Sequence, residues 1–75
     1  MDQTYLARYK TLGLNIAYYR KKRGLSQEEL AEKAEVDRST ISKTEIAFAG
    51  TSLDLIFKIA DILQVEPYKL FVERD

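Results

Sequence analysis

Apolar residues recur every three or four positions along most of this chain, which is the spacing of an amphipathic α-helix. The pattern is clearest near the N-terminus, at Tyr5, Tyr9, Leu12, Ile16 and Tyr19. At about 100° per residue these five side chains lie within about 80° of one another, so they form one stripe. The stripe predicts a first helix from about Thr4 to Lys22, with Gly24 as its C-terminal cap.

Two shorter helical patterns follow in the stretch LSQEELAEKAEVDRSTISKTE, residues 25–45. Ser26 and Glu29 have the S-x-x-E spacing of a capping box, so a second helix is predicted to begin at Ser26. Its inner face would consist of Leu30, Ala31 and Ala34. A third helix is predicted to follow the N-cap Asp37 and to run from Arg38 to about Glu45, with Ile41 pointing inward. Only three or four residues join these two helices, so the connection must form a sharp corner.

A fourth helix is predicted from Thr51 or Ser52 to about Gln64, with Thr51 and Asp54 as its capping pair. Pro67 suits the first position of a last, short helix, because the N–H that proline lacks has no partner there. Tyr68, Leu70 and Phe71 are expected to pack inward from it. No alternating apolar run with a hairpin turn is present. The pattern therefore predicts an all-α fold of five helices, in which residues 46–50 form the longest irregular connection.

The fourth helix carries more apolar surface than one core requires. Its apolar side chains span an arc of about 220°, whereas a helix that lies on a single core needs little more than about 100°. Either the N-terminal part of the first helix covers the excess, or a second subunit does, since exposed apolar patches mark interfaces. We expect a homodimer, whose interface residues would be Leu55, Ile62, Tyr68 and Phe71.

Length and composition exclude several classes of protein. Seventy-five residues, 1–75, make a single domain of thin stability, because so short a chain buries only roughly 60% of its unfolded surface. Without cysteine or histidine nothing resembles a nucleophile with its base, so we expect no enzyme, no metal site and no cofactor. No apolar run reaches the roughly 20 residues that span a bilayer, and no secretory signal is present. We therefore expect a cytoplasmic protein with no membrane partner.

The 12 basic and 12 acidic side chains cancel, which by itself argues against a nucleic-acid partner. Their distribution is uneven, with a net charge of +5 in residues 1–25, −3 in residues 26–50 and −2 in residues 51–75. The positive charge peaks at residues 20–23, RKKR. Such a run fits either a solvated helix end near the negative pole of the helix dipole or a phosphate-binding patch.

Two short helices joined at a steep corner form a helix-turn-helix, whose second helix, the recognition helix, enters the major groove of DNA. The stretch LSQEELAEKAEVDRSTISKTE, with LGLNIAYYRKKRG before it and SLDLIFKIADILQVEPYKLF after it, resembles the phage Cro/repressor-type helix-turn-helix DNA-binding domain family. The resemblance covers about residues 12–71, with the helix-turn-helix proper at about 26–45. It implies a compact five-helix, lambda-repressor-like domain, here with its first helix extended at the N-terminus.

Position by position, the resemblance implies a DNA-binding set that consists of Gln27, Arg38, Ser39, Thr40, Ser42 and Lys43. Gln27 would meet a phosphate at the start of the second helix, where backbone N–H groups favour anions, and would brace a neighbour that contacts a base. Arg38 would read a base, because its planar fork pairs with guanine O6 and N7. Thr40 would touch a phosphate, and Lys43 a phosphate or a base. Without the resemblance, these side chains would be interpreted as a solvated helix face.

The resemblance also implies an ion pair between Arg20 and Glu45, which would join the first helix to the end of the recognition helix. The other interpretation is that both are free surface charges. The chain departs from the family at Glu35, where glycine is frequent, and at Thr44, where a large apolar residue is common. Residues 46–52, IAFAGTS, also lack the charges of the family's phosphate-contacting loop. Phe48 in this loop is expected to pack against the body of the protein or against a partner.

These features predict a sequence-specific transcriptional regulator that binds double-stranded DNA as a homodimer and reads a palindromic operator through the major groove. No small-molecule effector is expected, because the chain has no room for a ligand-binding domain. The alternative is a protein-interaction module or an antitoxin-type partner with the same fold and weak DNA binding, which the zero net charge and the apolar loop favour. Salt dependence separates the two, because binding to DNA releases counterions.

Overall fold

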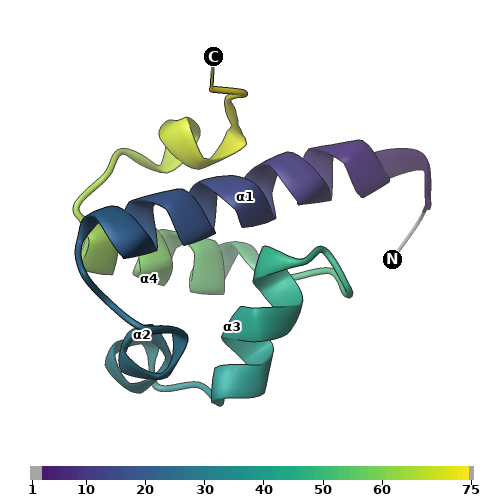
Figure 1. Ribbon diagram of the computed structural model, residues 1–75. Helices are drawn as coiled ribbons and strands as arrows, with labels where there is room; N and C mark the ends of the chain where they lie inside the picture. The colour runs from purple at the N-terminus through teal and green to yellow at the C-terminus, as the bar shows by residue number, and fades with distance from the viewer. Residues whose placement is uncertain (1–2, 75) are drawn as a thin grey trace.

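The computed structural model describes residues 3–74, which form four α-helices and two short 3₁₀ helices (Figure 1). In chain order these elements are η1 (Gln3–Tyr5), α1 (Leu6–Lys22), α2 (Gln27–Ala34), α3 (Arg38–Glu45), α4 (Leu53–Leu63) and η2 (Pro67–Phe71). No strand occurs between residues 3 and 74, so the predicted all-α fold is confirmed. The last of the five predicted helices is a 3₁₀ helix, because only five residues are available to it.

The long helix α1 runs through the middle of the fold, with the other elements packed around it. In Figure 1, α2 and α3 lie on one side of α1, η2 lies on the other, and α4 passes behind. The contacts agree with this view, since α1 packs against α3, α4 and η2, and α2 packs against α3 and α4. The N-terminal part of α1 projects beyond the other helices, as the extended first helix of the prediction requires.

The helix ends follow the predicted capping residues with two exceptions. The capping box is present, because Ser26 Oγ accepts the N–H of Glu29 and the Glu29 carboxylate accepts the N–H of Ser26. Thr51 was predicted to cap α4, and this prediction is wrong. Ser52 is the N-cap, since its hydroxyl accepts the N–H of Leu55 at 3.1 Å. Asp37 occupies the N-cap position of α3 without a hydrogen bond from its side chain.

A compact cluster of aliphatic side chains joins every α-helix to η2. Its fully buried members are Ile16 from α1, Leu30 from α2, Ile41 from α3, Ile56, Ile59 and Leu63 from α4, and Leu70 from η2. The predicted stripe of α1 is buried at Leu12 and Ile16 and partly buried at Tyr9 and Tyr19, whereas Tyr5 is exposed. Burial of these side chains supplies most of the driving force for folding, at about 25 cal/mol per Å² of apolar surface.

Only one side chain of η2 packs inward as expected. Leu70 is fully buried, but Tyr68 and Phe71 remain 63% and 50% exposed. This part of the prediction is wrong because a 3₁₀ helix of five residues presents one side chain per turn to the body of the protein. A second anchor holds η2 in place, since the buried amide of Asn15 in α1 donates to the carbonyl oxygens of Leu70 and Val72 at 2.9 and 2.8 Å.

Gly13 lets α1 and α3 approach closely. A Cβ atom on this buried glycine would lie 2.7 Å from the carbonyl oxygen of Thr44 and 2.7 Å from the carbonyl carbon of Glu45, and closer still to the Glu45 oxygen. Ordinary contacts of a Cβ atom begin near 3.4 Å. Gly13 lowers the helix propensity of α1, but it also allows the end of α3 to pack directly against α1.

Candidate nucleic-acid interface

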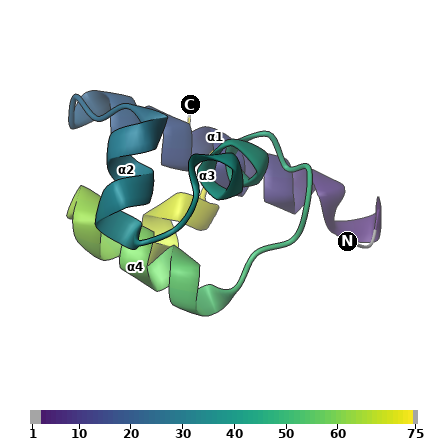
Figure 2. The same ribbon diagram turned by 90° about the horizontal axis from the view of Figure 1, so that it is seen from below.

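The corner between α2 and α3 is built from three residues, 35–37. Glu35 adopts the left-handed conformation, with φ of 59°, which ends α2 and reverses the direction of the chain. The N–H of Val36 then donates to the carbonyl oxygen of Ala31 at 3.0 Å. Figure 2 shows the result, with α3 seen end-on and α2 beside it seen from the side. Glu35 thus adopts the left-handed conformation that glycine favours at the end of a helix.

Packing holds this corner rigidly. Ile41 of α3 and Ala34 of α2 are fully buried, Ala31 is almost fully buried, and Val36 packs against the core. Because Ala31 is small, the two helices can approach closely. The Nζ atom of Lys58 in α4 donates to the carbonyl oxygen of Ala34, which ties the end of α2 to the rest of the protein. Contacts within the chain therefore set the angle between α2 and α3.

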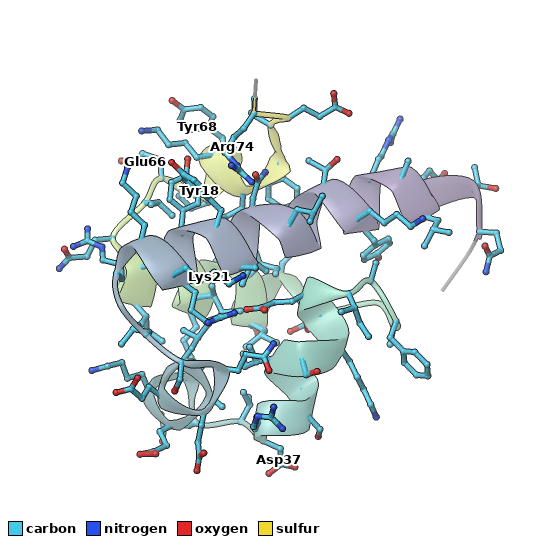
Figure 3. All side chains as sticks on the ribbon, in the orientation of Figure 1. Tyr18, Lys21, Asp37, Glu66, Tyr68 and Arg74 are labelled. Carbon is cyan, nitrogen blue, oxygen red and sulfur yellow. The ribbon has the colours of Figure 1, made fainter. Side chains whose placement is uncertain are left out.

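The outward face of α3 carries most of the predicted DNA-binding residues. Arg38, Ser39 and Lys43 are exposed, and Thr40 and Ser42 are partly buried at the edges of this face. Figure 3 shows the start of α3, beside the labelled Asp37, at the end of the molecule farthest from η2. The opposite face of α3 is buried through Ile41, Thr44 and Glu45. Polar groups on a protruding helix are thereby available to the edges of bases.

Arg20 and Glu45 form an ion pair at the inner end of α3, in agreement with the prediction. The Nε and Nη2 atoms of Arg20 donate to the two carboxylate oxygens of Glu45 at 2.7 and 3.0 Å, and the residues are only 8% and 9% exposed. The remaining Nη1 donates to the carbonyl oxygen of Leu25 at 2.9 Å. Through these hydrogen bonds the guanidinium group of Arg20 links the end of α1, the loop before α2 and the end of α3.

Gln27 belongs to the same network. Its Nε2 atom donates to Glu45 Oε1 at 2.9 Å, so that this carboxylate holds residues from α1 and α2 together. Gln27 was predicted to brace a neighbour that contacts a base. In this structure its hydrogen-bond partner is Glu45 and not a side chain of the outward face. The side chain is only partly buried, and its Oε1 atom takes no part in this bond.

Thr44 replaces the large apolar residue that is common at this position, and its polar group is satisfied internally. Its hydroxyl donates to the carbonyl oxygen of Thr40, one turn earlier, at 2.7 Å, and the side chain is buried. Burial of a hydroxyl costs little when it is hydrogen-bonded. The side chain at position 44 therefore faces the interior although it is polar.

The loop after α3 exposes its large apolar residues. Ile46 and Phe48 are 66% and 67% exposed, while Ala47 between them is buried. Of the two contacts expected for Phe48, packing against the body of the protein is wrong, and packing against a partner stays a prediction. Its ring lies beside α3, where Lys43 Nζ is 5.7 Å from the ring centroid. Sequence reasoning missed this contact, because Ala47 stands at the position where glycine usually marks a helix end of this kind.

The capping box at the start of α2 shifts the pKa of one of its own members. The backbone N–H of Ser26, followed by its hydroxyl, holds the pKa of Glu29 below its usual range. No group of three or more histidine, cysteine, aspartate or glutamate side chains in this part of the chain has the geometry to hold a metal ion. Among the helices of the described region, none combines the length and the apolar character that a membrane span requires.

A protruding helix, fixed at a steep corner to the helix before it and polar on its outward face, defines a helix-turn-helix protein. The helix-turn-helix family model, HTH_3, matches residues 16–70, and the chain belongs to this family. The uncharacterized HTH-type transcriptional regulator MJ0272 of Methanocaldococcus jannaschii is 40% identical over 60 residues, which cover 80% of this chain and 91% of that protein.

Solved structures agree with the family. The restriction-modification controller protein C.AhdI from Aeromonas hydrophila superimposes with a TM-score of 0.82 and 37% identity, covering 87% of this chain and 98% of that one. The master regulator for biofilm formation SinR, in a crystal structure with DNA, superimposes with a TM-score of 0.77 and 35% identity, covering 81% and 98%. The predicted resemblance to Cro/repressor-type helix-turn-helix proteins is thus confirmed.

Proposed function

We propose that this protein is a transcriptional regulator that binds double-stranded DNA by placing α3 in the major groove. The observation that carries the proposal is the outward face of α3, where Arg38, Ser39 and Lys43 are exposed on a helix whose other side is locked into the core. The names of the relatives support it, because MJ0272 is called a transcriptional regulator and the SinR structure contains DNA.

The contacts divide by chemistry. Arg38 reads a base, since its two parallel N–H donors match guanine O6 and N7. Ser39, Ser42 and Lys43 reach the neighbouring base edges or phosphates, and Thr40 contacts a phosphate. Gln27 lies in the first turn of α2, where the free backbone N–H groups attract a phosphate. The phosphate contacts fix the register, and the base contacts choose the sequence.

We further propose that the regulator acts as a homodimer on a palindromic operator. Several apolar side chains on elements other than α3 are exposed, and they include Leu53 and Phe57 of α4, Tyr68 and Phe71 of η2, and Val72. Leu55 and Ile62, the other two predicted interface residues, are partly buried against the chain's own core, so they contribute less area. Half-sites about 34 Å apart place each α3 about 17 Å from the two-fold axis. The protein measures 31 × 27 × 18 Å, which accommodates that distance.

Replacement of Arg38 tests the proposal directly. Genomic fragments recovered with the purified protein give the operator, and its affinity is then measured for Arg38→Ala at several salt concentrations. Loss of one bidentate contact is expected to cost about 1–3 kcal/mol and to relax the base preference at one position of each half-site. Arg74→Ala removes the same charge from the far side of α1 (Figure 3) and serves as the control.

Two results would contradict the proposal. One is the recovery of no enriched sequence, and the other is an equal, sequence-independent loss of affinity in Arg38→Ala and Arg74→Ala. The slope of log affinity against log salt provides a third measurement, because each neutralised phosphate contributes about −0.9 to it. A slope near zero would indicate that the apparent binding does not involve phosphates.

A second function is favoured by the loop after α3. Ile46 and Phe48 expose apolar surface beside the recognition helix, in a segment without charge. A module that binds a protein partner through this surface would show apolar association that is nearly independent of salt. The salt series described above therefore separates the two functions in one experiment.

A further inference from the structure

The end of α3 has the hydrogen bonds of a Schellman motif. The N–H of Phe48 donates to the carbonyl oxygen of Lys43 at 2.9 Å, and the N–H of Ala47 donates to that of Thr44 at 3.3 Å. Ala47 adopts the left-handed conformation, with φ of 58°, and is buried. These are the six-to-one and five-to-two bonds of the motif. The backbone therefore fixes the direction in which Phe48 leaves the helix.

This motif brings the side chains of its first and last residues together. An apolar contact is usual there, but in this chain the first residue is Lys43, one of the exposed residues on the outward face of α3. Its Nζ atom lies 5.7 Å from the centroid of the Phe48 ring, within the range of a cation–π contact. The ring remains 67% exposed, so burial does not explain its position.

We propose that Phe48 is a positioning residue for Lys43, which holds the ammonium group at one place beside α3 before DNA arrives. A free lysine side chain samples many rotamers, and these are lost when it contacts a phosphate or a base. A ring that already restricts Lys43 lowers this entropic cost. The inference rests on the proposed DNA-binding function and assigns a role to the uncharged loop within it.

The proposal has a competitor with the opposite sign. A ring that attracts the ammonium group also opposes its departure, so Phe48 would weaken binding if Lys43 had to leave the ring to reach DNA. Removal of the ring distinguishes the two, because it weakens binding in the first case and tightens it in the second. A ring that touches DNA by itself is a third case, in which its effect persists without Lys43.

A double-mutant cycle on the recovered operator tests the role of Phe48. Phe48→Leu keeps apolar volume and removes the π face, Phe48→Tyr keeps the face, and Lys43→Met removes the charge. We expect Phe48→Leu to weaken binding about two- to fivefold, the worth of an exposed cation–π contact. Phe48→Tyr should bind as the wild type does. In the Lys43→Met background, Phe48→Leu should have no further effect.

The control is Tyr18→Leu, which removes another ring beside cationic side chains, since Lys22 Nζ lies 5.8 Å and the Arg74 guanidinium carbon 3.8 Å from the Tyr18 centroid. Its effect on operator affinity should be absent. A readout without DNA is the NMR shift of the Lys43 ε-methylene protons, which the Phe48 ring current moves upfield and which Phe48→Leu should return to the ordinary position.

Four outcomes overturn the inference. They are tighter binding by Phe48→Leu, an unchanged affinity, a loss that persists in the Lys43→Met background, and an ordinary shift of the Lys43 protons in the wild type. The proposed function fails separately, through a wild-type protein that enriches no operator or through an Arg38→Ala variant that keeps full base preference. If the wild type binds its operator and the cycle is additive, only the role of Phe48 is lost.

Discussion

Replacement of Gly13 by alanine has two opposite effects on the stability of the protein, and the structure shows which of them is larger. Alanine at this interior helix position gains about 1 kcal/mol of helix propensity over glycine. The new Cβ, however, would lie 2.7 Å from the Thr44 carbonyl oxygen and closer to that of Glu45. Both are backbone atoms of α3, which cannot move aside as a flexible side chain would. Overpacking of this kind costs about 3 kcal/mol at the upper end of its usual range, so a net loss of about 2 kcal/mol is expected.

The assay for Gly13→Ala is thermal unfolding followed by circular dichroism. For a domain of this size each kcal/mol shifts Tm by about 4–8 °C, so the variant should melt roughly 8–16 °C below the wild type. The control is Lys10→Gly, at an exposed position of the same helix, which reports the glycine penalty alone and should lose about 1 kcal/mol. Both variants are thus expected to be destabilised, although one removes a glycine and the other adds one. A Gly13→Ala protein as stable as the wild type, or more stable, would refute the reasoning.

Three further predictions concern the helix ends and the buried pair. Glu45→Ala leaves the guanidinium of Arg20 buried without its carboxylate, so the free energy of unfolding should fall by about 3–5 kcal/mol. Replacement of both Arg20 and Glu45 by leucine should cost less. A double variant with a lower Tm than Glu45→Ala would argue against this. The pKa of Glu29 is lower in the folded protein, so the stabilisation by its carboxylate is present above the unfolded pKa and is lost as the pH falls through the folded pKa. On acidification, Tm should therefore fall more in the wild type than in Glu29→Gln. Parallel curves of Tm against pH for the two proteins would contradict this prediction. Glu35→Gly relieves a left-handed conformation and should raise the urea midpoint by the equivalent of about 0.5–1 kcal/mol, which a lower midpoint would disprove.

The sequence predicted the features of the fold that depend on local spacing. The stripe of α1 and the Ser26–Glu29 capping box are patterns within one helix. The capping box and the part of the stripe from Tyr9 to Tyr19 appear as expected, whereas Tyr5 lies before α1 and is exposed. The cap of α4 was placed one residue too early, because Thr51 and Ser52 are chemically alike and only the backbone geometry chooses between them. The inward packing of Tyr68 and Phe71 failed because apolar character does not reveal how many side chains a single 3₁₀ turn can bury.

The candidate site divides in the same way. The Arg20–Glu45 pair was predicted from the family resemblance and is present. The bond from Gln27 to Glu45 was not predicted, because it depends on how α2 lies across α3. The contact between Phe48 and Lys43 was hidden by Ala47, since a Schellman motif is usually recognised by glycine at that position. The three hydrogen bonds from Asn15 to the end of the chain left no signal, because an isolated asparagine in a helix is most often solvated.

The anchoring of the C-terminal end has a practical consequence for binding experiments. Asn15 Oδ1 accepts a hydrogen bond from Arg74 Nε at 2.8 Å, and the Arg74 guanidinium stacks on Tyr18, on the side of α1 opposite α3 (Figure 3). A biotin or a sensor surface coupled beside Arg74 would leave the recognition helix facing the solution. The same attachment would crowd Tyr68 and Phe71. In the proposed homodimer, immobilised protein would then report the affinity of one subunit for one half-site, and the difference from free protein would measure the contribution of dimerisation.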